Sequence, residues 1–241
     1  MQKKKLNEKL VSILSEEDFS THVKCRIRDM GENMIPDLID IMVSTSLPRG
    51  KDSGKECVRS NAAQTLGELK AIEAIEPMLE VLDSCDEQDS LYHEIRFAFM
   101  DMGKPIIEPA IKAYETTTRT SVRTAIADSL TLLGVSDPRI LAVLMQALHS
   151  DDPHFDYKLF GEYGDRSVLP ELSAALDRWT VTRNAVADQK IVDLAWSIFC
   201  LGGSLTRHQT KKVNLVKKNS EEPAAEFLVR MIDALSHPSH N

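Results

Sequence analysis

The fold is decided by residues 61–82, NAAQTLGELKAIEAIEPMLEVL, because the chain repeats their pattern several times. Apolar residues at helical spacing run up to a corner at Lys70, and a second apolar series follows it. Residues 159–176, LFGEYGDRSVLPELSAAL, have the same order with the corner at Gly164. Further copies cover residues 23–42, 95–114 and 122–148. The pattern predicts paired helices joined by a tight corner, repeated along the chain.

The corners align in one column, and their spacing gives the period of the repeat. They fall 39, 33, 31, 30 and 38 residues apart, at Gly31, Lys70, Gly103, Gly134, Gly164 and Gly202. A period of about 30–40 residues built from paired helices is typical of an α-solenoid. Glycine suits such a corner because it adopts a positive φ at no steric cost. We therefore expect an all-α solenoid of five to six helix pairs.

The residue types inside each pair agree with this prediction. Apolar stripes line both helices of the second pair: Val58, Ala62, Leu66 and Leu69, then Ile72, Ile75, Met78, Leu79 and Leu82. Small side chains at Ala62 and Ala63 predict a close approach of neighbouring helices. Prolines lie near the start of the second helices, where a missing N–H costs least: Pro36, Pro77, Pro109 and Pro170. Asp137 and Asp165 are expected to cap the helices after them.

Two stretches, 58–82 and 155–178, resemble a known repeat most closely. Both are variants of the motif Leu-Gly-x-x-Gly-Asp followed by two apolar residues and a proline, which is similar to the HEAT-like repeat of the phycobilisome-lyase type. The resemblance extends over residues 20–205 and implies a right-handed superhelix of antiparallel helix pairs. It also implies that the second helix of each pair lies on the concave side. Repeats of this class mostly mediate contacts between proteins.

The remaining segments define the expected domain organisation. Residues 1–19 contain an amphipathic helix that we expect to cap the repeat array at 20–205, because a terminal repeat otherwise exposes its apolar face. Residues 206–241 hold a basic run at 207–218 and a second capping helix around 227–235. The polar insertion at 44–56 is predicted to be an exposed loop. Both the loop and the basic run are further candidates for a contact surface.

Composition excludes several functional classes. A net charge of −8 and an aromatic content of 5% argue against nucleic-acid binding. No apolar stretch is long enough to span a membrane. The basic start is interrupted by Glu8 and Lys9, unlike a signal peptide. Four scattered cysteines without a C-x-x-C pair favour reduced, mostly buried thiols and a cytoplasmic protein.

The sequence contains no recognisable catalytic constellation. His93-Glu94 is its single His-Glu pair, whereas the di-iron HEAT-type hydroxylases that this chain resembles bind metal through several such pairs. Trp196 is predicted to lie in the core, Trp179 could be exposed, and Cys57 is expected to be an inert thiol. We therefore expect no catalytic, cofactor-binding or metal-binding residue and no small-molecule substrate.

One polar band is a candidate interaction surface. Glu76, Glu80 and Asp83 in one second helix align with Glu108, Lys112 and Glu115 in the next, each set opposite an apolar stripe. Such a band is either a solvated face or a contact for a basic partner protein. The leading hypothesis is a non-catalytic protein–protein interaction scaffold that uses its concave helical surface. The alternative is an enzyme or enzyme subunit on the same solenoid, similar to a bilin lyase or a nucleic-acid repair enzyme.

Overall fold

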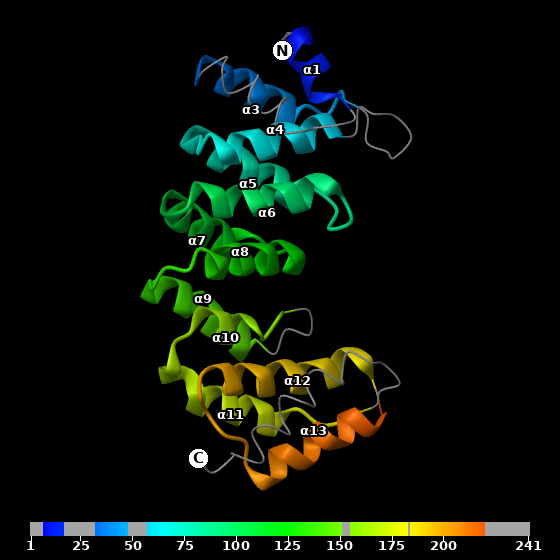
Figure 1. Ribbon diagram of the computed structural model, residues 1–241, viewed down its shortest axis with the longest axis vertical. Coiled ribbons are helices and arrows are strands. Elements are labelled where there is room, and N and C mark those ends of the chain that lie inside the picture. The colour runs from blue at the N-terminus through cyan, green and yellow to red at the C-terminus, as the bar shows by residue number, and fades with distance from the viewer. Residues whose placement is uncertain (1–6, 17–31, 48–56, 151–154, 183, 220–241) are drawn as a thin grey trace, which may run out of the picture. The chain divides into compact units, whose positions relative to one another are not determined.

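The computed structural model describes residues 7–16, 32–47, 57–150, 155–182 and 184–219, and every regular element in these ranges is a helix (Figure 1). The prediction of an all-α chain is confirmed for this part of the molecule. The chain forms two compact units, residues 1–135 and 136–241. Their boundary falls inside the array predicted for residues 20–205.

The first unit is a stack of helices in two layers. Its helices are α1 (Glu8–Leu14), α3 (Ile35–Val43), α4 (Cys57–Glu68), α5 (Ile75–Ser84), α6 (Ser90–Met102), α7 (Ile107–Thr116) and α8 (Thr120–Leu132). The first helices of the predicted pairs, α4, α6 and α8, contact one another in sequence order. The second helices, α3, α5 and α7, do the same in the other layer. Figure 1 shows this succession of pairs, with α1 packed against α3 and α4 at one end.

The second unit continues the pairing from residue 136. It contains α9 (Pro138–His149), α10 (Leu159–Tyr163), α11 (Leu169–Arg178), α12 (Ala185–Cys200) and α13 (Arg207–Asn219). Helix α12 contacts α10, α11 and α13. The sequence predicted only the first helix of the sixth pair, and α13 provides the second. The fourth predicted pair is divided: α8 belongs to the first unit and α9 to the second.

The corner column predicted from the sequence is confirmed at every described position. Gly103, Gly134, Gly164 and Gly202 have φ values of 75°, 63°, 84° and 72°. Lys70, which occupies the same column, has a φ of 53° and is the one non-glycine residue with a positive φ in the described part of the chain. Gly31 lies outside the described residues. The repeat therefore imposes a left-handed corner on whichever residue stands there.

Four of the second helices begin in the same way, with a short 3₁₀ turn followed by an early proline. These turns are Glu32–Met34, Ile72–Ala74, Lys104–Ile106 and Arg166–Val168, and they precede α3, α5, α7 and α11. The predicted caps are also present. The carboxylates of Asp137 and Asp165 accept hydrogen bonds from the backbone N–H groups of Arg139 and Ser167, at 2.9 and 2.8 Å. Capping carboxylates and early prolines thus determine where these helices begin, as the sequence predicted.

The first-helix layer packs closely because its facing residues are small. Ala62 and Ala63 are fully buried, as predicted. A Cβ added to Gly67 in α4 would lie 2.6 Å from the Cα of Ala98 in α6, so only glycine fits there. Ile72, by contrast, was predicted to be in the core but is 58% exposed. It lies in the 3₁₀ turn before α5, where the helical spacing of the stripe does not apply.

Two further predictions about burial are wrong. Trp196 is half-buried rather than part of the core, and its ring packs against Gly161 in α10, where an added Cβ would be 2.6 Å from it. Cys57 and Cys200 are exposed, and of the described cysteines only Cys85 is buried. All three are free thiols, while Cys25 lies outside the described residues.

Basic side chains link consecutive second helices at their C-terminal ends. Arg119 Nη2 donates to the carbonyl of Cys85 at 2.7 Å, and Arg119 Nη1 donates to the carbonyl of Asp83, at the end of α5. Lys212 Nζ in α13 donates to three carbonyls at the end of α11, those of Leu176, Asp177 and Trp179. These contacts satisfy carbonyls that have no partner within the helix.

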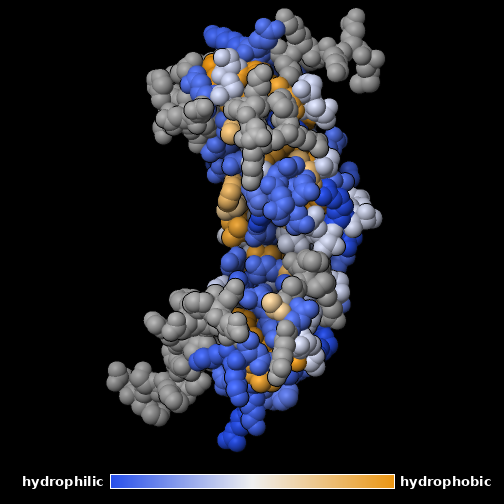
Figure 2. All heavy atoms as spheres, turned by 90° about the vertical axis from the view of Figure 1, so that its right-hand side faces the viewer, coloured by the Kyte–Doolittle hydropathy of each residue, from blue (hydrophilic) through white to orange (hydrophobic). Residues whose placement is uncertain are grey.

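The surface is mostly polar on the face shown in Figure 2, where described hydrophilic residues predominate and hydrophobic residues show mainly between them. None of the described helices combines the length and the hydrophobicity needed to cross a membrane.

Candidate functional site

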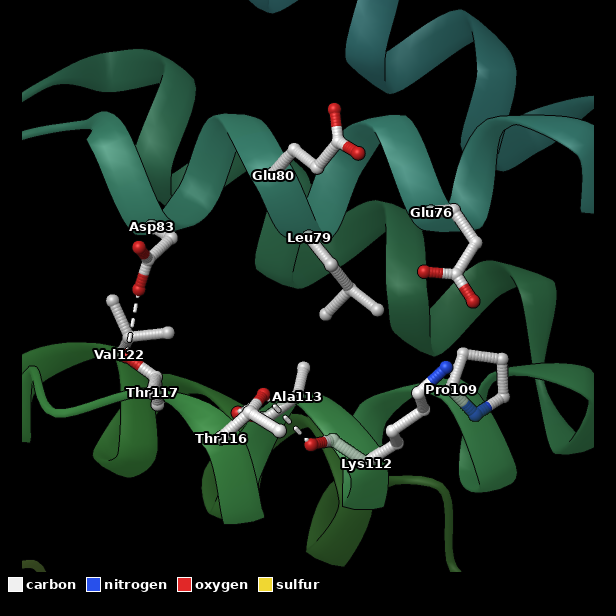
Figure 3. Close-up of a pocket in the computed structure, with 10 residues that line it drawn as sticks. All are labelled: Glu76, Leu79, Glu80, Asp83, Pro109, Lys112, Ala113, Thr116, Thr117 and Val122. Atoms are coloured by element: carbon white, nitrogen blue, oxygen red, sulfur yellow. Dashed lines mark hydrogen bonds between the residues drawn. The ribbon is translucent and has the colours of Figure 1, made fainter.

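A groove of about 380 Å³ lies between α5 and α7 in the first unit (Figure 3). Its walls are formed by these two second helices and by the segment that leads into α8. The lining residues are Glu76, Leu79, Glu80, Asp83, Pro109, Lys112, Ala113, Thr116, Thr117 and Val122. The groove combines an apolar floor with a mainly acidic rim.

Helical spacing places the acids of α5 on one face. Glu76, Glu80 and Asp83 are separated by four and three residues, so they follow one another along the exposed side of the helix. Leu79 and Leu82 face the interior and are 6% and 0% exposed. Burial of this apolar stripe fixes the rotation of α5 and so directs the three carboxylates to solvent.

Hydrogen bonds from the next repeat hold one end of the groove. Thr117 Oγ1 donates to the Asp83 carboxylate at 2.6 Å, and Arg119 binds the two carbonyls at the end of α5 described above. Thr116 Oγ1 donates to the carbonyl of Lys112 within α7 at 3.0 Å. The rim at Asp83 is therefore built by contacts between neighbouring repeats.

The other two carboxylates are available for a partner. Glu76 and Glu80 are exposed, and neither forms a hydrogen bond or ion pair within the described part of the chain. In Figure 3 the Lys112 side chain extends from α7 toward Glu76, and the Glu80 carboxylate points away from α7. The rim thus carries three carboxylates against one ammonium group.

The floor of the groove is hydrophobic, and its larger side chains are almost completely buried. Leu79 and Val122 are 6% and 1% exposed, and the side chains of Pro109 and Ala113 complete it. An apolar floor below a carboxylate rim suits the side chains of lysine and arginine, whose aliphatic stems cover apolar surface while the charged ends stay solvated. The groove can therefore accept basic side chains of another protein without burying an unpaired charge.

The six residues of the predicted band do not all belong to this groove. Glu76, Glu80, Asp83 and Lys112 line it. Glu108 and Glu115 are exposed on α7 but are not among its lining residues. Five further lining residues were not predicted to belong to a site: Pro109, Ala113, Thr116, Thr117 and Val122. The 34-residue separation of Asp83 and Thr117, close to one repeat period, is the signal that would have pointed to Thr117.

A second groove, of about 540 Å³, lies between α3 and α5 in the same unit. Its lining residues are Asn33, Ile35, Pro36, Ile39, Asp40, Glu73 and Pro77. It holds two carboxylates, and Asp40 has an interaction partner within the chain. The α5–α7 groove has the larger number of carboxylates, three against two, although its lysine makes the formal net charge of the two grooves equal.

The other residues considered in the sequence do not form a site together. His93 is exposed, and among the described residues no group of three or more His, Cys, Asp or Glu side chains is arranged to hold a metal ion. Trp179 is half-buried, with its ring 6.4 Å from that of Tyr157. Partial burial and the nearby Glu162 carboxylate raise the pKa of the Cys200 thiol, so this exposed cysteine is not activated.

Two other segments were predicted as contact surfaces, the basic run at 207–218 and the loop at 44–56. The basic run at 207–218 forms most of α13. In the 44–56 loop, only residues 44–47 are within the described part of the chain, while the capping helix predicted around 227–235 lies outside it.

Comparison with known families gives one match, and it covers the repeat that forms one wall of the groove. Residues 58–84, which contain α5 and all of α4 except its first residue, match the PBS lyase HEAT-like repeat. This confirms the resemblance for the second helix pair. A search among curated proteins finds no match to the chain.

Proposed function

We propose that this protein is a non-catalytic interaction scaffold whose α5–α7 groove binds a basic segment of a partner protein. The observation that supports this proposal is the combination of an apolar floor with three rim carboxylates and a single lysine. Glu76 is the main contact residue, because it is exposed and unpaired within the described part of the chain and faces the groove, and the exposed Glu80 adds negative charge at the outer edge of the rim. Asp83, held by Thr117, provides a fixed acceptor at one end.

Charge determines what the groove selects and how fast it binds. Carboxylates around a narrow groove attract a basic partner and repel acidic ones, so they raise the association rate more than the final affinity. The attraction acts over roughly one Debye length, about 8–10 Å at physiological salt. Binding should therefore slow as the salt concentration rises. The same negative rim disfavours phosphate backbones, which supports a protein partner rather than a nucleic acid.

The HEAT-like repeat supports the same proposal at the level of architecture, because solenoids of this kind present extended surfaces to their partners. We extend the proposal to a right-handed superhelix with the second helices on its concave side. We also place the protein in the cytoplasm, where the exposed thiols of Cys57 and Cys200 would remain reduced.

The test is affinity capture from the native extract with three forms of the full chain. The first is the wild type, and the second is the groove variant Glu76→Lys/Glu80→Lys. The third is a control, Glu87→Lys/Asp101→Lys, which makes the same change in charge at exposed positions outside the groove. Association rates with the captured protein are then measured at low and high salt.

The proposal predicts that wild type and control bind the same basic protein and that the groove variant binds it about tenfold more slowly or worse. The association rate of the wild type should fall with salt. Equal rates for the groove variant and the wild type would show that the contact lies elsewhere on the surface. Turnover of a small molecule by the purified chain would favour the enzymatic alternative instead.

A further inference from the structure

A second strongly charged surface of this chain lies on α13 in the second unit. The helix carries Arg207, Lys211, Lys212, Lys217 and Lys218 and no aspartate or glutamate, in a chain whose net charge is −8. Isolated charges on a helix are ordinary, but five of one sign within thirteen residues are not balanced along the helix itself.

Packing divides these residues between two faces of α13. Gln209, Val213 and Val216 are buried on the inner face, where Gln209 Nε2 donates to the carbonyl and hydroxyl oxygens of Ser173. Lys212 lies beside this face and caps α11. Lys211, Leu215 and Lys218 share the opposite, exposed side, with Leu215 47% exposed. An exposed leucine between two lysines is therefore the centre of the outer face.

The outer face of α13 and the α5–α7 groove have matching spacing. Lys211 and Lys218 are seven residues apart, as are Glu76 and Asp83. In a helix this separation is about 10 Å and returns to nearly the same side. Leu215 lies three residues before Lys218, and Leu79 lies three residues after Glu76. An antiparallel alignment thus opposes Lys218 to Glu76, Leu215 to Leu79, and Lys211 to Asp83.

We propose that α13 of one copy of this chain docks antiparallel in the α5–α7 groove of a second copy. The inference rests on the proposed function of the groove and names its occupant. Opposite charges meet at both ends, and the exposed leucine covers the apolar floor formed by Leu79, Ala113 and Val122. A helix seated over two others is ordinary ridge-into-groove packing.

The assembly that results joins two different surfaces. Each copy has one groove and one α13, so a copy can act both as donor of the helix and as acceptor. Reciprocal docking of the α13 helices of two copies gives a closed two-fold dimer, whereas docking of one α13 per pair of copies gives open chains or rings. Because the pairs are solvent-exposed, the association should weaken as salt rises.

The experiment is sedimentation velocity of the full chain over a range of concentrations at low and high salt. The wild type should associate with increasing concentration, and less so in high salt. The groove variant Glu76→Lys/Glu80→Lys and the α13 variant Lys211→Glu/Lys218→Glu should each be monomeric when alone. The control Glu87→Lys/Asp101→Lys should behave as the wild type.

Mixing the two defective variants gives the decisive measurement. The groove variant retains a normal α13, and the α13 variant retains a normal groove. An equimolar mixture should therefore form a one-to-one complex that grows no further. A wild type that stays monomeric at low salt, or a mixture that does not associate, would overturn the proposal.

The antiparallel register has its own test. In a chain with Glu76→Lys and Lys218→Glu, the charges of this opposed pair are exchanged and still attract. In a chain with Glu76→Lys and Lys211→Glu, like charges meet at both ends of the groove. The first chain should therefore associate about tenfold or more strongly than the second. Equal association of the two would contradict this register. If the wild type is monomeric while the groove variant still loses its basic partner from the extract, the groove's function stands and only the second copy is excluded as its occupant.

Discussion

Lys70 shows how strongly the repeat controls a single residue. It has a φ of 53° at a corner where the equivalent described positions are glycine. A left-handed conformation costs a residue with a Cβ roughly 1–2 kcal/mol, so the surrounding helix pair must hold the corner in place. The Lys70 N–H and the Ala71 N–H close the end of α4 by donating to Gly67 and Leu66 carbonyls, at 2.8 and 3.0 Å.

This conformation predicts different effects on stability for two substitutions at corner positions. Gly164→Ala should lower the free energy of unfolding by about 1 kcal/mol, because its φ is 84° and a Cβ there would meet no atom within 4 Å, leaving backbone strain alone. Lys70→Gly should not destabilise the protein, since relief of strain offsets the added flexibility of the unfolded chain. Denaturant unfolding of both variants measures the difference. A Gly164→Ala protein as stable as the wild type would show that the corner relaxes.

Asp193 is a buried carboxyl whose charge is poorly solvated. It is 3% exposed, accepts a hydrogen bond from Gln189 Nε2 at 2.7 Å and lies 3.7 Å from Lys158 Nζ. Burial raises the pKa of this carboxyl and outweighs the opposing effect of the Gln189 hydrogen bond. The folded chain therefore binds this proton more tightly than the unfolded chain.

The raised pKa predicts a pH-dependent loss of stability. Because the folded state holds more protons on Asp193, the free energy of unfolding decreases as the pH rises from the usual aspartate pKa, near 3.8, to the raised value. Asp193→Asn should remove this part of the pH dependence. Urea unfolding at a series of pH values tests it, with the exposed Asp101→Asn as control. A profile for Asp193→Asn parallel to that of the wild type would contradict the assignment.

Helices are linked by side chains as well as by their apolar stripes. Arg119, just before α8, and Lys212, within α13, each reach back to the preceding repeat and bind carbonyls at the C-terminal end of its second helix. A cation at this position also interacts favourably with the negative end of the helix dipole. These contacts join neighbouring second helices. Arg119, which follows α7, binds the end of α5, and Lys212 in α13 binds the end of α11.

This linkage predicts the effect of removing one cation. Lys212→Met should lower the free energy of unfolding by about 1–2 kcal/mol, because three carbonyls at the end of α11 lose a charged donor. Lys211→Met, at the neighbouring exposed position, is the control and should change stability by less than about 0.5 kcal/mol. Both are measured by denaturant unfolding at high salt. Equal stabilities of the two variants would show that the carbonyls are solvated equally well without Lys212.

At the scale of the whole molecule, the first unit is closed at one end by α1. Leu10, Ile13 and Leu14 are buried against α3 and α4, and Asn61 Nδ2 donates to the carbonyl of Leu14 at 2.8 Å. Asn7 accepts from the N–H of Leu10 and donates to the Asp37 carboxylate, at 3.2 and 2.8 Å. These contacts support the capping role expected for residues 1–19.

Removal of the cap should expose the face it covers. A protein lacking residues 1–18 should unfold at lower denaturant and aggregate, since each buried side chain of this size contributes roughly 1.5–3 kcal/mol. A protein lacking only residues 1–6 keeps Asn7 and α1 and is the matched control. Light scattering and denaturant unfolding report both effects. A monomeric 1–18 deletion with unchanged stability would show that α1 is not a cap.

The sequence predicts those structural features that depend on residues close together in the chain, and it fails for features that depend on contacts with other repeats. The corner at Lys70, the cap at Asp137 and the early prolines were predictable, because backbone conformation and capping depend on residues close in the chain. The exposure of Ile72 was not, since a 3₁₀ turn interrupts the helical spacing before α5. The half-exposed Trp196 and the groove wall at Thr117 were missed because each depends on another repeat.

The sequence alone determined the all-helical pairs, their corners and the exposed acids of α5, because a repeated pattern of apolar, glycine and proline residues acts within each pair. Tertiary structure decided which acids share a groove. Glu76, Glu80 and Asp83 line it with Lys112, whereas Glu108 and Glu115 do not. Spacing within a helix gives the direction of a side chain, but the separation and rotation of two packed helices decide which directions converge.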